Sequence, residues 1–231
     1  MIMKTLGIIG GIAPGSTIEY YRQIVDSYRE RTNEYPSIIL NSIDLKRMLG
    51  LVAAGRLEEL TGYLLTEIER LALARADVGL LASNTPHIVF DEIRKRSPIP
   101  LISIVEAARD AAKARGLERL GLFGTRSTMA GSFYPDVFSR AGMVLVIPRE
   151  DEQNYIHQKY MEELVNGKFL PETREGLLNV VRKMIARDRI DGLILGGTEL
   201  PLILRDEREA GIALLDTTAI HVQKAVAALL A

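Results

Sequence analysis

Two stretches of this sequence place small polar residues directly after an apolar run. One is Leu80-Leu81-Ala82-Ser83-Asn84-Thr85-Pro86-His87, and the other is Leu193-Ile194-Leu195-Gly196-Gly197-Thr198-Glu199-Leu200-Pro201. Ligands of open α/β sheets bind at the carboxyl ends of strands. Amide and hydroxyl groups placed there can hold a small polar ligand, and a carboxylate can transfer protons. We interpret the two stretches as one active-site pair contributed by two related halves.

An internal repeat supports two related halves. Aligning Asp77 with Asp191 pairs the two stretches at an offset of 191 − 77 = 114 residues. The same offset brings 6–11 onto 120–125, and an offset of 113 brings 101–103 onto 214–216. Parallel strands buried on both faces resemble one another in any protein. Three blocks in the same order nevertheless favour a duplicated unit, and a period this long predicts two domains rather than a solenoid.

Short apolar strands alternating with amphipathic helices must position these residues. Strands are expected at 6–9, 37–43, the run before Ser83, 101–104, 120–123, 143–147, 193–195 and 214–216. Helices are expected from Ser16 or Thr17 to 31, then at 58–76, 89–95, 106–115, 132–140, 153–164, 172–187 and 219–230. This alternation predicts an α/β fold with mainly parallel sheets.

A glycine-rich turn, Gly10-Gly11-Ile12-Ala13-Pro14-Gly15-Ser16-Thr17, follows the first strand. We expect Ser16 or Thr17 to cap the next helix, with Glu19 in its first turn. Backbone N–H groups at such a turn can hold an anion. The G-x-G-x-x-G spacing of a dinucleotide site fails at Ile12, although Asp44 after the second strand resembles a ribose-binding acid. A tight turn without a ligand is the alternative.

Composition and charge describe an ordinary globular protein. The chain has 231 residues, of which 47% are hydrophobic and 26% charged, and its net charge is −1. Neither a basic excess for nucleic acid nor an apolar run of roughly 18 residues for a membrane span is present. The N-terminal apolar run is too short for a signal peptide, so we expect a cytoplasmic protein.

The sequence contains no cysteine, which excludes disulfides, thiol metal sites and thiol catalysis. Its three histidines, His87, His157 and His221, have no metal-ligand spacing, so no metal is expected. Lys46 and Arg47, which follow the second strand, stand near the ligand edge of the sheet and can meet a carboxylate. A solvated pair in a loop is the alternative.

Five blocks together resemble the aspartate/glutamate racemase family. They are Gly10-Gly11 with Ser16-Thr17, Ser83-Asn84-Thr85-Pro86-His87, Gly124-Thr125-Arg126-Ser127-Thr128-Met129, Gly196-Gly197-Thr198-Glu199-Leu200-Pro201 and Asp216-Thr217-Thr218-Ala219-Ile220-His221. The resemblance implies two α/β lobes related by a pseudo-twofold axis, with the active site in the cleft between them. The first lobe would comprise 1–98 with 212–231, and the second 99–211. It also implies cofactor-independent racemisation of an acidic amino acid, commonly by a homodimer.

The chemistry of the family uses two thiols, whose positions here are Ser83 and Gly197. Each thiol transfers a proton on one face of the substrate. The pKa of a free thiol is near ~8.5, and neighbouring groups can lower it into the working range. A serine hydroxyl is a far weaker base unless another base activates it, and glycine has no side chain. The two-thiol mechanism is therefore impossible here. Glu199, at a position that assists the second thiol in relatives, can itself be an acid/base group or an exposed first-turn residue.

The residues that would bind the substrate are retained. The resemblance places Asn84, Thr85 and Thr198 at the α-carboxylate. The wider set of candidate binding residues is Gly11, Ser16, Thr17, Asn84, Thr85, Thr125, Thr128 and Thr198. Helix capping is the alternative role for Thr125 and Thr128. His87 lies one helical turn beyond Ser83 and is a candidate base or a capping or core residue, whereas His157 and His221 are interpreted as structural.

Three functional hypotheses follow from these residues. The first is an acidic amino-acid racemase or related isomerase that uses substitutes for the thiols, such as Ser83 and Glu199. The second is a binding protein that keeps the small-carboxylate pocket without turnover. The third is a hydrolase or lyase in which His87 activates Ser83, although the G-x-S-x-G elbow of such enzymes is missing.

Overall fold

The computed structural model describes residues 4–231, which form two compact units. Unit 1 comprises the chain up to Ile104 together with His221–Ala231, and unit 2 comprises Val105–Ile220. The changeovers therefore lie six and nine residues beyond the expected lobe boundaries at 98/99 and 211/212. The first follows the last strand of unit 1, and the second falls inside the last helix.

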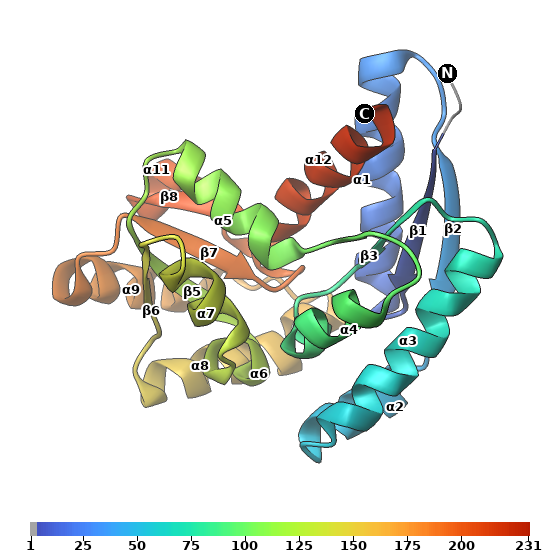
Figure 1. The fold of residues 1–231 in the computed structure, drawn as a ribbon. Helices are drawn as coiled ribbons and strands as arrows, with labels where there is room; N and C mark the ends of the chain where they lie inside the picture. The colour runs from blue at the N-terminus through green and yellow to red at the C-terminus, as the bar shows by residue number, and fades with distance from the viewer. Residues whose placement is uncertain (1–3) are drawn as a thin grey trace. The chain divides into compact units, whose positions relative to one another are not determined.

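Unit 1 is built on a four-stranded parallel sheet in the order β2-β1-β3-β4 (Figure 1). Its strands are β1 (Thr5–Gly10), β2 (Ser37–Ser42), β3 (Val78–Leu81) and β4 (Leu101–Ile102). The central strands β1 and β3 are almost completely buried, as expected for strands covered by helices on both faces.

Helices cover both faces of this sheet. On one face, α1 (Pro14–Thr32) and the part of α12 (Thr217–Leu230) from His221 onward share a core with Leu6, Ile8 and Leu80. Core residues on the other face come from α2 (Leu45–Ala53), α3 (Leu57–Leu73), the 3₁₀ helix η1 (Thr85–Val89) and α4 (Phe90–Arg96). Unit 1 is therefore a three-layer α/β/α structure.

Unit 2 repeats the same strand order, β6-β5-β7-β8, with all strands parallel. Its strands are β5 (Arg119–Gly124), β6 (Val144–Val146), β7 (Gly192–Gly196) and β8 (Ala213–Asp216). At an offset of 114, both ends of β1 fall on the ends of β5. The duplicated parallel α/β unit that the sequence predicts is confirmed.

The helices of unit 2 complete its layers. They are α5 (Ile104–Ala114), α6 (Arg126–Ala130), α7 (Phe133–Ser139), α8 (Glu150–Glu162), η2 (Leu164–Asn166), α9 (Pro171–Asp188), α10 (Leu200–Ile203) and α11 (Glu207–Ala210). Helices α8, α9, α10 and α11 share one core with Phe123, Leu193 and Leu195 of the sheet. No helix within residues 4–231 has the length and apolar character needed to cross a membrane.

Strand register sets which residues meet at the carboxyl edge of each sheet. In unit 1, Ile9 pairs with Leu81, and the Ala82 N–H donates to the Ile9 carbonyl at 2.9 Å. The β1–α1 turn and Ser83 therefore lie side by side. In unit 2, Gly124 pairs with Gly196, so the residues after β5 and after β7 also lie side by side. Each unit therefore brings together the candidate site residues that follow its own two central strands.

Candidate functional site

The glycine-rich turn after β1 has no room for a side chain at Gly11. This residue has φ of +85°, and a Cβ atom there would lie 2.7 Å from the Ile43 carbonyl oxygen. The Gly11 N–H donates to Thr17 Oγ1 at 2.8 Å, and this hydroxyl donates to the Ala13 carbonyl at 3.2 Å. Thr17 is buried and its two hydrogen bonds close the turn. This candidate binding residue therefore has a structural role.

The expectation that Ser16 or Thr17 caps this helix is wrong. The N-cap of α1 is Ala13, and Pro14 is its first residue. Proline is favoured there because its φ suits a helix and its missing N–H would have no partner in the first turn. Ser16 and Thr17 therefore lie inside the first turn, and Glu19 lies beyond it. Ser16 is buried and has a polar partner.

The end of β3 carries the polar run of unit 1. Ser83 is half-buried, whereas Asn84 and Thr85 are buried at the start of η1. The Asn84 carbonyl accepts from the His87 N–H at 3.0 Å, which closes the first turn of η1. Asn84 and Thr85 are thus placed directly beside Ser83 by a short helical turn rather than by a flexible loop.

Both ring nitrogens of His87 are in use. Its Nδ1–H donates to the Ser83 carbonyl oxygen at 2.9 Å, and its Nε2 accepts from the Ile104 N–H at 3.2 Å. Burial, together with neighbouring His221, lowers the pKa of His87 to about 3, so the ring is neutral. A base for Ser83 needs a free ring nitrogen at the Ser83 hydroxyl. The hypothesis that His87 activates Ser83 is therefore not supported, and His87 is a structural residue.

His221 is a second buried, neutral histidine in unit 1. It accepts from the Tyr20 hydroxyl at 3.1 Å and donates to the Ile102 carbonyl at 3.0 Å. Burial lowers the pKa of His221 to about 4, and its ring meets that of His87 edge to face at 6.2 Å. This arrangement agrees with the structural role predicted for His221.

The two basic residues that follow β2, Lys46 and Arg47, lie in a helix. Lys46 and Arg47 belong to α2, which the sequence analysis missed in favour of a loop. Asp44 is its N-cap and accepts from the Arg47 N–H at 3.0 Å, so the carboxylate that resembled a ribose-binding acid caps a helix. The Arg47 guanidinium lies over the Tyr63 ring at 4.3 Å and lines a groove of about 720 Å³ between α2 and α3.

In unit 2, the turn after β5 is closed by two threonines. Thr125 is the N-cap of α6 and accepts from the Thr128 N–H at 3.3 Å, and the two hydroxyls lie 3.1 Å apart. Thr128 is completely buried, and its side chain fills the space beside Gly124 and Gly196. Thr125 thus has the capping role that was its alternative and is half-exposed at the strand end, whereas Thr128 packs in the interior.

The end of β7 holds a contact that sequence analysis missed. A Cβ atom at Gly197 would lie 2.5 Å from Tyr160 Cε2 and 2.8 Å from its hydroxyl oxygen. The φ of Gly197 is not in the left-handed region, so the ring of Tyr160, not backbone strain, requires glycine here. The space that a side chain at position 197 would occupy is filled from helix α8.

Tyr160 and Thr198 both hydrogen-bond to Glu199. The Tyr160 hydroxyl donates to Glu199 Oε2, and the Thr198 hydroxyl donates to the same oxygen at 2.8 Å. Burial, with the charge of Glu199 next, holds the pKa of Tyr160 well above its ordinary value, so Tyr160 stays protonated and acts as a donor. Glu199 and Thr198 are themselves half-buried. The end of β7 therefore presents an acid whose orientation two hydroxyls fix.

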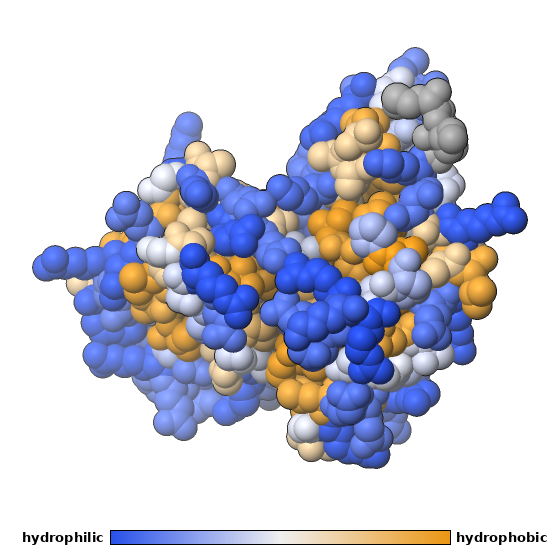
Figure 2. Space-filling model, in the orientation of Figure 1, coloured by the Kyte–Doolittle hydropathy of each residue, from blue (hydrophilic) through white to orange (hydrophobic). Residues whose placement is uncertain are grey.

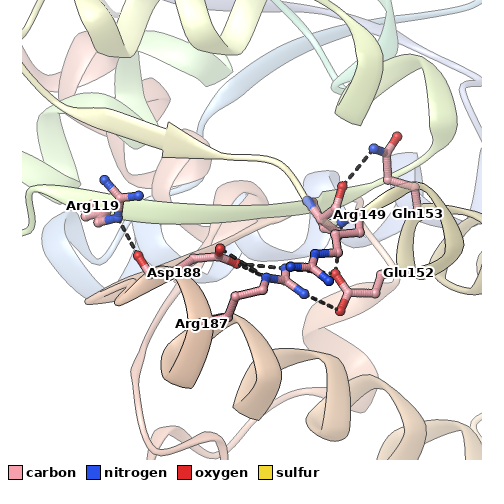
Figure 3. A network of polar contacts seen from close by, with 7 residues as sticks. Arg119, Arg149, Glu152, Gln153, Arg187 and Asp188 are labelled. Carbon is pink, nitrogen blue, oxygen red and sulfur yellow. Dashed lines mark hydrogen bonds and ion pairs between the residues drawn. The ribbon is translucent and has the colours of Figure 1, made fainter.

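An ion-pair network holds the helix that carries Tyr160. Arg187 of α9 donates to both oxygens of buried Glu152 on α8, at 2.9 and 3.0 Å (Figure 3). Glu152 also accepts from the Arg149 N–H at 2.9 Å, and Arg187 contacts Asp188. Burial raises the pKa of Glu152, but the hydrogen bonds from Arg187 and Arg149 outweigh it and lower the pKa overall. The N-terminal end of α8 is therefore fixed to the C-terminal end of α9.

The third histidine, His157, lies in unit 2 beside the turn after β5. His157 of α8 accepts from the Arg126 N–H at 3.2 Å, and burial and nearby Arg126 lower its pKa. Among residues 4–231, no group of three or more His, Cys, Asp or Glu side chains is arranged to hold a metal ion.

The fold and these strand ends define a class of protein: two four-stranded parallel α/β units, each ending its central strands in small polar residues. The sequence matches the Asp/Glu/Hydantoin racemase family over residues 9–225. The chain therefore belongs to that family.

Solved structures support this assignment. The chain is similar to an Asp/Glu racemase candidate from Yersinia pestis, with 31% identity and a TM-score of 0.92 over 99% of this chain and 100% of the other. An aspartate racemase homologue from Pyrococcus horikoshii OT3 has 30% identity and a TM-score of 0.87 over the same shares. An aspartate racemase from Picrophilus torridus, at 23% identity, TM-score 0.75 and coverage of 98% and 93%, shares the fold.

Curated relatives match over shorter segments. A glutamate racemase from Histophilus somni (strain 129Pt) is 25% identical over 138 residues, which is 55% of this chain and 46% of the relative. The match thus spans about half the length of that racemase.

Proposed function

We propose that this chain binds a small acidic amino acid, with aspartate and glutamate as first candidates, and transfers the proton at Cα without a thiol or a cofactor. Family membership supports amino-acid isomerase chemistry. Because the sequence has no cysteine, the proton carriers are groups other than thiols. Glu199, two residues beyond the thiol position at Gly197, is the first of them, and Ser83, which occupies the other thiol position, is the second.

The observation that carries this proposal is the placement of polar groups at the central strand ends of both units. Asn84 and Thr85 follow β3, Thr198 follows β7, and Thr125 follows β5. We propose that Asn84, Thr85 and Thr198, with nearby backbone N–H groups, hold the α-carboxylate, and that Thr125 adds a donor. Gly11, Ser16 and Thr17 would shape the floor of the site, and Thr128 would support Thr125.

The proposal requires that the strand ends at Ser83 and Gly197 both reach one small substrate at ~3–3.5 Å. A crystal structure with aspartate bound tests this directly.

Calorimetry is the first test of the ligand class. Aspartate, glutamate, malate and phosphate are titrated into the protein, with leucine and lysine as neutral and cationic controls. At least one dicarboxylate should bind with a Kd below ~10 mM, which corresponds to a binding free energy of about −3 kcal/mol or stronger. Proton NMR in D₂O then tests loss of the α-hydrogen signal. Binding of lysine or leucine without any dicarboxylate would refute the proposal.

A binding protein without turnover is the second candidate. It is favoured by the Tyr160 ring, which fills the space of a side chain at Gly197. Tight aspartate binding with no exchange of the α-hydrogen would support this candidate over the first.

We also propose a homodimer, as the family resemblance implies, and a cytoplasmic location, as the sequence analysis expects. Charged residues cover much of the visible surface, with apolar patches between them (Figure 2). Ile18 and Tyr21 of α1 are 69% and 49% exposed, and Leu40 of the edge strand β2 is 46% exposed. Light scattering coupled to gel filtration measures the oligomeric state, and cell fractionation the location.

A further inference from the structure

The two halves differ in the groups that can carry a proton at their central strand ends. In unit 1, the segments 10–17 and 82–87 contain one titratable side chain, His87. Its two ring nitrogens are bonded to the Ser83 carbonyl and the Ile104 N–H. Beside β1, the carboxylate of Asp44 caps α2. Within these segments, no side chain is placed to act as a base for Ser83.

Unit 2 has a carboxylic acid at the corresponding place. Glu199 is two residues beyond Gly197, and the hydroxyls of Tyr160 and Thr198 both donate to its Oε2. Tyr160 is 6% exposed, and its helix is held by the Glu152–Arg187 pair, so the phenol is a fixed donor. Two fixed donors orient the carboxylate, as a proton-transfer group requires.

We propose that this chain transfers the α-proton on one face of its substrate only, with Glu199 as the base and Tyr160 as its positioning residue. The inference rests on the proposed function and narrows it. The chain would exchange the α-hydrogen of one enantiomer with solvent and retain its configuration, whereas two opposed bases would interconvert the enantiomers.

The step is balanced without an added reactant. The Glu199 carboxylate takes the α-proton, so the Cα–H bond breaks and an O–H bond forms. The electron pair moves from Cα into the substrate carboxylate, where the proposed donors stabilise the added charge. The protonated Glu199 exchanges with solvent and returns a deuteron to the same face, since the proposal includes no proton carrier for the other face.

The experiment incubates L- and D-aspartate and L- and D-glutamate separately with the protein in D₂O. Proton NMR follows loss of the α-hydrogen, and chiral chromatography follows the other enantiomer. Exchange of one enantiomer of a substrate without its mirror image appearing supports the inference. Exchange of both with interconversion overturns the inference while the proposed function stands. Saturable binding with no exchange overturns both and leaves the binding protein.

Two variants assign the roles. Glu199→Gln should lower the exchange rate by at least about 100-fold while aspartate still binds, because it keeps the shape but removes the base. Tyr160→Phe keeps the ring against Gly197 and removes one donor, so kcat should fall about 10-fold with little change in KM.

The matched controls lie on α8, the helix that carries Tyr160. Tyr155→Phe and Glu162→Gln make the same two kinds of substitution there and should leave the exchange rate within about twofold of the parent rate. Thermal melting and aspartate calorimetry establish that each variant is folded and binds. Unchanged exchange in a folded Glu199→Gln variant would overturn the inference.

Discussion

The ring of Tyr160 occupies the space that a side chain at Gly197 would need, with 2.5 Å between the ring carbon Cε2 and an ideal Cβ position. The two residues belong to different elements, helix α8 and the loop after β7. The absence of a side chain at position 197 is therefore matched by a large one at position 160. The two positions should behave as a coupled pair.

Replacing Gly197 by alanine should destabilise unit 2 by about 1–3 kcal/mol, because the new methyl group overpacks against Tyr160. Urea unfolding measures this. In a Tyr160→Leu background the same change should cost less than about 1 kcal/mol, which a double-mutant cycle detects. Gly62→Ala is the control, since a Cβ atom there meets nothing within 4 Å. Equal costs in both backgrounds would contradict the coupling.

Ser83→Cys should convert one-face exchange into racemisation. Ser83 is half-buried, and a thiol there would add an acid/base group on the face that lacks one. The rate of interconversion of L- and D-aspartate should rise by about 10²–10⁴-fold, as measured by polarimetry. Ser83→Ala is the control and should show no gain. Adding Gly197→Cys should not help unless Tyr160 is also shortened.

Unfolding stability should fall as the pH drops from 6.5 to 5. Histidine titrates near ~6.5 in the unfolded chain, whereas burial lowers the pKa of His87 to about 3 and of His221 to about 4. The unfolded state therefore binds protons that the folded state does not, and stability is lost as the pH falls. Each group should cost about 2 kcal/mol at pH 5.

Urea titrations at pH 7 and pH 5 test this. Only three histidines occur in the chain, so few other side chains titrate in that range. The variant His221→Gln should lose about half of the pH dependence. Equal stability of the parent at the two pH values would show that these rings are not buried as neutral groups.

Arg187→Met should destabilise the chain by about 3 kcal/mol, because it leaves the 4% exposed Glu152 buried without its ion-pair partner. Arg182→Met on the same helix is the matched control. Its pair with Glu175 is 51% and 64% exposed, and its loss should cost less than about 1 kcal/mol. Chemical unfolding compares them, and similar values would contradict a special role for Glu152.

The architecture was predictable from local pattern. The apolar runs that end in glycine or serine gave the central strands, since only buried parallel strands are apolar on both faces. The 114-residue repeat predicted the shared topology. The start of α1 was misplaced because two signals competed, and Pro14 outweighs the hydroxyls of Ser16 and Thr17. Helix α2 was missed because its charged first turn resembles a loop.

The candidate site was less predictable, because its decisive contacts join distant positions. Tyr160 and Gly197 are 37 residues apart, and only the packing of α8 brings them together. No local signal distinguishes Tyr160 from other tyrosines on an amphipathic helix. The spacing of His87 from Ser83 likewise does not reveal that the Ile104 N–H, 17 residues further on, occupies the second ring nitrogen of His87.

The discontinuous make-up of unit 1 has a consequence for synthesis. Its core includes four residues from the final segment of the chain, Val222, Ala225, Val226 and Leu229. The buried hydroxyl of Tyr20, on α1, also donates to His221 in that final segment. Unit 2 lies wholly within Val105–Ile220. On a translating ribosome, the unit that emerges first is therefore the one completed last. Until the final segment is made, the apolar side of α1 lacks the residues that cover it in the folded unit.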